Sequence, residues 1–240
     1  MEKTQPTAHL SFDRPLVTVD VVVFTVRQER LQVLLVQRPA APREPFPGAW
    51  ALPGGFIDTG ADRTLLACAR RKLKEKTGVA SPYLEQLGSW GSATRDPRGW
   101  SATHAYFALI SMPAEREPQS GAPVQQWMPI EDAMRRKLAF DHGEILEAAL
   151  ARLRSKAEYT SLPAFLLPEP ITLPQLQQTY EIVLGRVLDK SAFRRRMLDA
   201  GFLEEAGSVV GPGGRPAQGY GIVDRSAATV FPRTFKSGEA

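Results

Sequence analysis

Runs of β-branched and other apolar residues in the first part of the chain predict extended strands. Residues 16–26 (LVTVDVVVFTV) form one such run, and residues 31–37 form a second. The polar residues 28–30 stand between these two runs, so a hairpin turn is the simplest connection. Further strands are expected near residues 83–90, 101–111 and 124–128.

Two segments of the same part carry the three-and-four spacing of amphipathic helices. The first covers residues 62–77 and is followed by Gly78, a residue type that commonly ends helices. The second covers residues 141–156 (DHGEILEAALARLRSK), with Asp141 as a candidate N-cap. Strands around one helix, closed by another helix, predict an α/β/α sandwich.

Two short helices are expected in the last third of the chain. Thr172 and Gln175 have the spacing of a capping box, which predicts that a helix starts there. After a short turn, Asp189 is a candidate N-cap for a second helix that runs to Ala200. The buried stripe of the first helix is expected to contain Leu173, Leu176, Tyr180 and Val183. Two short helices joined by a tight turn are typical of a helix-turn-helix.

A hairpin is expected after these helices. Its strands are predicted near residues 202–205 and 220–223, with a tip rich in Gly and Pro between them. A hairpin in this place is a wing. The fold class is therefore α/β + α/β, with a sandwich in residues 1–157 and a small winged helix-turn-helix domain in residues 158–240. The proline-rich residues 163–174 are expected to connect the two domains and to pack on the second.

Composition adds boundaries to this picture. A chain of 240 residues is long enough for two modest domains. Its formal net charge of +4 permits a polyanionic partner without requiring one. Cys68 is the single cysteine, so no internal disulfide can form. The sequence shows neither a signal peptide nor an apolar run of membrane-spanning length, so a cytoplasmic protein without a membrane partner is expected.

One stretch of the first part carries candidate chemistry. The glycine pair 54–55 (LPGGFID) is followed by residues 69–79 (ARRKLKEKTGV). This outline is similar to the Nudix signature, which has Gly, five residues, Glu, seven residues and then Arg-Glu-apolar-x-Glu-Glu-x-Gly-apolar. Arg71, Leu73, Glu75 and Gly78 occupy their places in that pattern.

Other positions of the signature have changed. Lys72 and Lys76 stand where the family has two metal-binding glutamates, and Arg63 stands at the upstream glutamate. The interval from Gly55 to Arg71 is also two residues longer than in the signature. A site that the family builds to hold Mg²⁺ has therefore become positively charged.

The altered motif predicts nucleotide binding without catalysis. Mg²⁺ requires hard oxygen ligands, and pyrophosphate hydrolysis requires the metal to polarise the phosphoryl group. On a helix, Lys72, Glu75 and Lys76 share one face, where a single carboxylate between two ammonium groups is a poor metal site. The same face could hold a pyrophosphate directly. Alternatively, it is only a solvated, salt-bridged surface. No metal ligand and no catalytic residue is assigned.

The second short helix of the last third has the pattern of a recognition helix. Such a helix directs cations to the duplex and an apolar back to the core. If Phe193 and Met197 form that back, Arg195 points directly away from it. If Leu198 widens the back, Arg195 still points outward and Arg194 is partly shielded. The predicted DNA-binding residues are Lys190, Ser191, Arg194, Arg195 and Arg196, with Arg215 at the wing tip. The alternative is an arginine-rich helix in a domain that docks onto other proteins.

The chain as a whole resembles the NrtR-type transcriptional regulators, in which a Nudix-like domain precedes a winged helix. The resemblance rests on LVTVDVVVF, LPGGFID, RKLKEKTGV, RDPRGWS and LAFDH in the first domain, and on LPEPITLPQLQ, KSAFRRR and GRPAQGY in the second. It implies a homodimeric repressor of NAD biosynthesis and salvage genes that binds a palindromic operator in double-stranded DNA. It also implies ADP-ribose as the effector that releases the operator, with no cofactor required.

The resemblance places the effector site around the altered motif. The residues expected there are Arg38, Trp50, Phe56, Asp58, Arg71, Lys72, Lys76, Arg95 and Asp96. Arg38 and Arg95 are equally compatible with structural salt bridges, and His142 is assigned no catalysis. The alternative function is a Mg²⁺-dependent Nudix hydrolase of ADP-ribose or a related nucleotide sugar. Such an enzyme would need Glu75, together with Asp58 or Asp62, to hold the metal.

Overall fold

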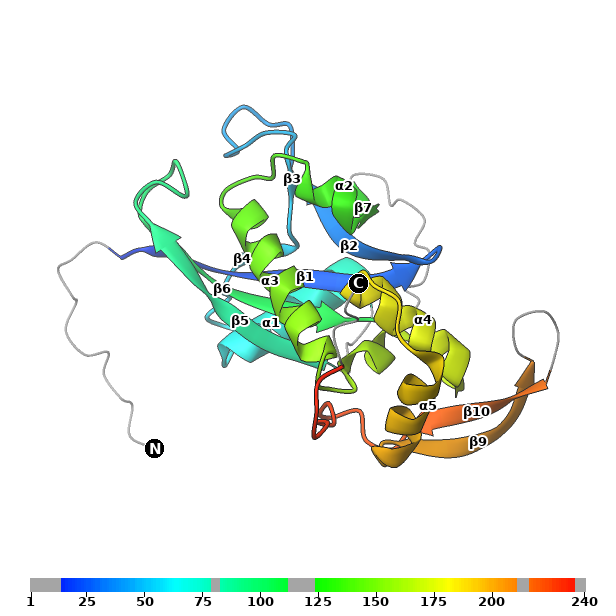
Figure 1. Cartoon of the computed structure of the whole chain (residues 1–240). Helices are drawn as coiled ribbons and strands as arrows, with labels where there is room; N and C mark the ends of the chain where they lie inside the picture. Colours follow the sequence, from blue (N-terminus) through cyan, green and yellow to red (C-terminus); the bar gives the residue numbers. More distant parts are fainter. Residues whose placement is uncertain (1–13, 79–82, 112–123, 211–215, 236–240) are drawn as a thin grey trace, which may run out of the picture.

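The computed structural model describes residues 14–78, 83–111, 124–210 and 216–235. Its larger part is a mixed β-sheet between helices, and its smaller part joins two helices to a three-stranded sheet (Figure 1). The predicted α/β/α sandwich followed by a winged helix-turn-helix is confirmed. None of the helices in these ranges is both long and apolar enough to cross a bilayer.

Seven strands make up the larger sheet. They are β1 (Leu16–Arg27), β2 (Arg30–Gln37), β3 (Trp50–Ala51), β4 (Gly54–Phe56), β5 (Tyr83–Ser92), β6 (Ser101–Leu109) and β7 (Gln125–Pro129). The main order is β3-β2-β1-β6-β5, with β4 paired to β1 and β7 paired to β2. Only the β1–β6 pairing is parallel among the strands described.

Side-chain alternation along β1 builds a core on each face of the sheet. Val21 and Val23 pack with helix α1 (Leu65–Thr77), whereas Val22 and Phe24 pack with helix α3 (His142–Ala157). The two helices therefore cover opposite faces, with α3 in front of the sheet in Figure 1 and α1 behind it.

The local signals of the first domain were accurate within a few residues. Gln28 and Glu29 form the β1–β2 turn with positive φ angles, 50° and 56°, as hairpin turns require. Helix α1 starts three residues later than expected, because the Thr64 side chain caps it by accepting from Ala67 N. It ends at Gly78, whose φ is 71°. The short helix α2 (Ile130–Met134) was not predicted, since five residues carry no helical period.

Asp141 occupies the N-cap position of α3, as predicted, but its side chain makes no capping hydrogen bond. The carboxylate instead accepts two hydrogen bonds from the Arg95 guanidinium. A buried guanidinium thus replaces the helix N–H groups as the partner of this acid.

The smaller domain contains the 3₁₀ helix η1 (Leu162–Leu166), β8 (Ile171–Thr172), α4 (Leu173–Leu184), α5 (Lys190–Asp199), β9 (Leu203–Val210) and β10 (Pro216–Ile222). Both halves of the Thr172–Gln175 capping box are present, and Asp189 caps α5 by accepting from Ala192 N. The whole predicted stripe of α4 is buried.

Two expectations for this domain needed correction. Leu198 does not belong to the core of α5, because its side chain is 43% exposed. The hairpin strands β9 and β10 are longer than expected, since Gly207 and Gly219 lie within them where glycine had indicated a turn. The tip, with Arg215, lies outside the described residues.

The connector between the domains is a packed element. Within η1, Phe165 belongs to the core of the first domain and Ala164 to that of the second. Val183 of α4 also reaches the first core. Because both cores share this region, the division between residues 157 and 158 stays a prediction.

Candidate ligand cleft and nucleic-acid interface

A cleft of about 280 Å³ opens between the ends of β2 and β4, the loop after β5 and the start of α3. Five of the nine predicted effector residues line it: Arg38, Phe56, Lys76, Arg95 and Asp96. The fold therefore gathers residues that are up to 58 positions apart in the chain, from Arg38 to Asp96, around one opening.

The floor of the cleft is a buried network of charged groups. Asp20 is 5% exposed, and its carboxylate lies 3.5 Å from His142 Nε2 and 3.8 Å from Arg95 Nη2. Burial alone would raise the pKa of Asp20, but the nearby His142 holds it below its ordinary value. Leu52 N donates to His142 Nδ1 at 2.9 Å, which leaves Nε2 to face the carboxylate.

Arg95 is fixed from several sides within this network. Its Nε and Nη2 donate to the Asp141 carboxylate at 2.8 and 2.7 Å, and Nη1 donates to Ser101 Oγ at 3.4 Å. The guanidinium is therefore pre-positioned, and only its remaining donor capacity can serve a ligand.

The glycine pair of the altered motif makes room for two charged side chains. A Cβ on Gly54 would lie 1.9 Å from Asp20 Oδ1, so the acid occupies the space that a side chain would need. A Cβ on Gly55, whose φ is 144°, would lie 3.1 Å from Lys72 Nζ. The pair thus brings the β4 backbone close to an acid on one side and an ammonium group on the other.

One wall of the cleft carries an arginine that sequence reasoning missed. Arg98 donates through its backbone N, Nε and Nη2 to the Asp96 carboxylate, and its guanidinium lies 5.3 Å from the Phe56 ring centre. Asp96 is 3% exposed, and these bonds hold its pKa below the ordinary value against the opposing effect of burial. The exposed ring and the cation form a mixed aromatic and basic wall.

Two missed residues had a signal in the sequence. Asp20 is a charged residue within an otherwise apolar strand, and such an acid needs a buried partner. Arg98 lies in the RDPRGWS motif, only two positions from Asp96. His142 ends the LAFDH motif, but its contact with Asp20 depends on the packing of α3.

Arg38 and Arg95 both have the ion pairs that their structural alternative predicts. Arg38 donates to Glu44 and to Pro45 O, and it lies 4.9 Å from the Phe140 ring centre. Both arginines also line the cleft. Their structural partners therefore do not remove them from the candidate site.

The other predicted effector residues lie outside the lining of the cleft. Trp50 packs against the first core, and the Asp58 carboxylate accepts from Gly60 N and Ala61 N. Arg71 donates to Asp62 and Glu75, while Lys72 lies 3.8 Å from Glu75. The pairs of Glu75 with Arg71 and Lys72 follow the spacing of a helix, whereas the contact of Arg71 with Asp62 depends on the loop before α1.

The carboxylates near α1 are already engaged. Asp62 is 2% exposed at its side chain and accepts from Arg71 and from Asp58 N. Hydrogen bonding from Arg71 keeps the pKa of Asp62 far below its ordinary value. Within the described ranges, no group of three or more His, Cys, Asp and Glu side chains has the arrangement of a metal site.

Helix α5 offers exposed cations on a buried apolar back. Phe193 and Met197 are buried, whereas Lys190, Ser191, Arg194 and Arg195 are exposed. Arg196 differs, because its Nη2 donates to Thr234 O at 2.6 Å and its guanidinium lies 4.0 Å from the Phe235 ring centre. Burial lowers the pKa of Arg196 relative to its ordinary value.

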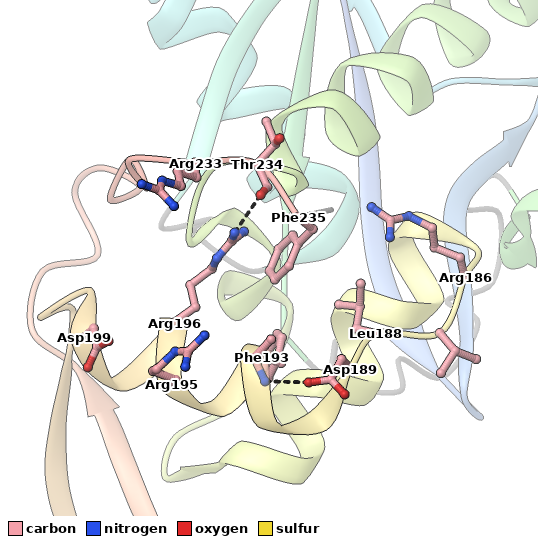
Figure 2. Close-up of a pocket in the computed structure, with 12 residues that line it drawn as sticks. Arg186, Leu188, Asp189, Phe193, Arg195, Arg196, Asp199, Arg233, Thr234 and Phe235 are labelled. Carbon is pink, nitrogen blue, oxygen red and sulfur yellow. Dashed lines mark hydrogen bonds between the residues drawn. The ribbon is translucent and has the colours of Figure 1, made fainter. Parts of the chain in front are cut away.

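A hollow of about 440 Å³ lies between α5, the turn before it and the chain segment that follows the hairpin (Figure 2). Arg195 of the helix and Arg233 of the later segment both line this hollow. Arg195 therefore belongs both to the exposed face of α5 and to the lining of this hollow, where Arg233 adds a second cation.

Two family models match the chain. The NUDIX domain matches residues 15–149, and the NrtR DNA-binding winged helix domain matches residues 163–222. The chain is 48% identical over 222 residues to the ADPR responsive transcriptional repressor NtrR of Acinetobacter baylyi. That alignment covers 92% of this chain and 88% of the relative.

Solved structures are similar over the same regions. Shewanella oneidensis NrtR complexed with a 27mer DNA superposes with a TM-score of 0.83 at 42% identity, covering 92% of this chain and 99% of that chain. The NUDIX domain of the same protein, complexed with ADP ribose, gives a TM-score of 0.53 at 46% identity. It covers 60% of this chain and 91% of that chain.

Proposed function

Since the chain belongs to the NrtR family, we propose that it is a transcriptional repressor whose hold on its operator is controlled by ADP-ribose. The observation that carries this proposal is the presence, in one chain, of a cleft lined by Arg38, Lys76, Arg95 and Arg98 in a Nudix domain and of a helix with exposed cations in a winged helix. One similar protein is an ADPR responsive repressor. Another, Shewanella oneidensis NrtR, has structures with DNA and, for its NUDIX domain, with ADP ribose.

The cleft has the chemistry that a nucleoside diphosphate sugar requires. Lys76 and Arg98 supply cations for the pyrophosphate, as a point charge and as a planar fork respectively. The Phe56 ring is 46% exposed and can pack on a base or a ribose. Arg95, held by Asp141, is ready to donate without further ordering.

Binding in this cleft is proposed to proceed without hydrolysis. Lys72 and Lys76 occupy positions of the metal-binding glutamates, and Asp58 and Asp62 are engaged by backbone groups and by Arg71. Glu75 also pairs with Arg71. The protein would then respond to ADP-ribose as a ligand and not as a substrate.

Helix α5 is proposed to enter the major groove of the operator, with Arg195 at the centre of its exposed face and Lys190, Ser191 and Arg194 beside it. We further propose a homodimer on a palindromic site upstream of genes for NAD biosynthesis and salvage. ADP-ribose would then favour a dimer geometry in which the two helices no longer match their half-sites.

Binding to duplex DNA from upstream of neighbouring NAD-metabolism genes tests the proposal, with and without ADP-ribose. Release of AMP is followed in the same samples with Mg²⁺ present. Tight binding that ADP-ribose weakens, with no AMP, is the expected result. Steady AMP release without sequence-selective binding would overturn the proposal in favour of a hydrolase. Arg195→Ala should weaken DNA binding and leave ADP-ribose binding intact.

A further inference from the structure

The segment that follows the hairpin runs back to the residues between α3 and η1, and backbone hydrogen bonds fix it there. Ser161 N donates to Thr229 O at 2.9 Å, and Phe231 N donates to Tyr159 O at 2.7 Å. Phe235 N donates to Glu158 O at 3.1 Å. The segment 229–235 therefore has a defined path, anchored to the residues that follow α3.

Aromatic packing fixes the same segment to the recognition helix. Phe231 and Phe235 are buried, and the Phe235 ring stacks on Phe193 of α5 with 5.9 Å between ring centres. Arg196 closes this contact by donating to Thr234 O while its guanidinium covers the Phe235 ring. The residues between the two phenylalanines are consequently held at the surface beside α5.

Arg233 is one of these surface residues. It is exposed and lines the same hollow as Arg195, and Figure 2 shows Arg195, Arg196 and Arg233 along one side of it. In the described part of the chain, the side chains of Arg195 and Arg233 make no hydrogen bond or ion pair with another residue. Two exposed cations without acid partners on one hollow form a surface suited to an anion.

The other charges around the hollow leave this surface basic. Arg186 is matched by Glu158, at 2.8 Å. Asp189 and Asp199 also border the hollow, but the Asp189 carboxylate accepts from the first turn of its own helix. Apart from these engaged groups, the charged residues that border the hollow are Arg195, Arg196 and Arg233 and one acid, Asp199.

We propose that Arg233 binds a backbone phosphate of the operator duplex, beside the groove entered by α5. Figure 1 shows the segment in red on the left of α5 and the β9–β10 hairpin on its right. The segment would therefore form a second flank of the DNA-binding surface, opposite to the wing. This inference rests on the proposed DNA-binding function.

A phosphate contact has a specific signature, because each one releases a counterion from the duplex. Log affinity falls as log salt rises, and removing one such ion pair should make the slope of this line less steep by about 0.9. We expect Arg233→Gln to lower the slope by this amount and to weaken operator and unrelated duplexes equally, since phosphates carry no sequence information. Arg233→Lys should retain the slope, because lysine keeps the charge.

The matched control is Arg135→Gln, directly after α2 and far from α5, where the arginine side chain is 77% exposed. It should bind DNA as the unmodified chain does. Thermal unfolding should be unchanged in all three variants, since neither arginine is buried. An unchanged salt slope and affinity in Arg233→Gln would overturn the inference alone. An unmodified chain that shows no salt-dependent duplex binding would overturn the proposed function as well.

Discussion

The lysines of α1 differ in what surrounds each ammonium group. Lys76 lines the cleft, whereas Lys74, two positions earlier on the same helix, is exposed away from it. Because a hydrogen bond to a charged group is worth more than a neutral one, Lys76→Gln should weaken ADP-ribose binding about tenfold. Lys74→Gln removes the same charge and should have little effect. Calorimetric titration of both variants distinguishes a local contact from a general loss of positive charge.

The Asp62 carboxylate is expected to make the stability of the first domain depend on pH in the acid range. Its folded-state pKa is lowered by Arg71, so the stability that it contributes is complete above the ordinary aspartate pKa of about 4 and is lost as the pH falls below it. Asp62→Asn should lower the Tm at neutral pH and should also flatten the fall in Tm on acidification. Asp132→Asn, at a half-exposed site, is the control. Parallel curves for Asp62→Asn and the unmodified chain would contradict this role.

At single positions, the sequence predicted residue types better than partners. Lys76 of the altered motif lines the cleft, as do Arg95 and Asp96 of the RDPRGWS motif, and their role in effector binding stays a prediction. The choice of Asp141 as the partner of Arg95 depends on how α3 packs, and no spacing in the sequence encodes it. Arg196 likewise has the sequence context of a DNA contact, yet it faces Phe235 in the fold.

The segment 229–235 assigns different tasks to neighbouring arginines of α5. Arg195 is free to meet DNA, whereas Arg196 holds Thr234 and Phe235. Arg195→Gln should therefore reduce the salt slope of DNA binding by about 0.9 for each phosphate that the arginine binds. Arg196→Gln should lower the Tm and weaken DNA binding with little change in slope, because it displaces the helix and removes no phosphate contact. A slope reduced equally in both variants would place Arg196 on the DNA after all.

Helix α4 depends on its capping box. Thr172 Oγ1 accepts from Gln175 N, and the Gln175 side chain accepts from Thr172 N. Thr172→Ala removes the acceptor for Gln175 N and should lower the free energy of unfolding by about 1 kcal/mol. Urea unfolding measures this change. Ser191→Ala, at an exposed position in the first turn of α5, offers a control with little expected effect.

Elements with local signals were predictable, and those set by distant partners were not. Each cap of α4 and α5 involves only four consecutive residues, so the sequence predicted where both helices start. The segment 229–235 has no period of its own and owes its path to Tyr159 and Glu158. The full length of β9 was hidden for the same reason, because pairing with β10 overrides its glycine.

Helix α3 spans the molecule from the cleft to the second domain. Asp141 and His142 stand at its start, and Glu158 directly follows its end and pairs with Arg186. If this helix transmits the response, Glu158→Gln should reduce the factor by which ADP-ribose weakens DNA binding. Each affinity measured alone should change little.

The same measurements contain an internal test. DNA must weaken ADP-ribose binding by the same factor as ADP-ribose weakens DNA binding, so the reduction should be equal in both directions. The control is Glu131→Gln on α2, which removes a half-exposed ion pair with Arg30 of β2. An undiminished factor in Glu158→Gln would mean that coupling takes another route.

The space shared by Gly54 and Asp20 has a consequence for the history of the family. A side chain at position 54 and a carboxylate at position 20 cannot occupy the same volume, although the two positions lie on different strands. Relatives that have gained a side chain at position 54 should therefore have lost the acid at position 20, and with it the buried partner of His142. The two positions are therefore expected to covary. The glycine of the motif is needed for the space that the Asp20 carboxylate occupies as well as for a tight backbone.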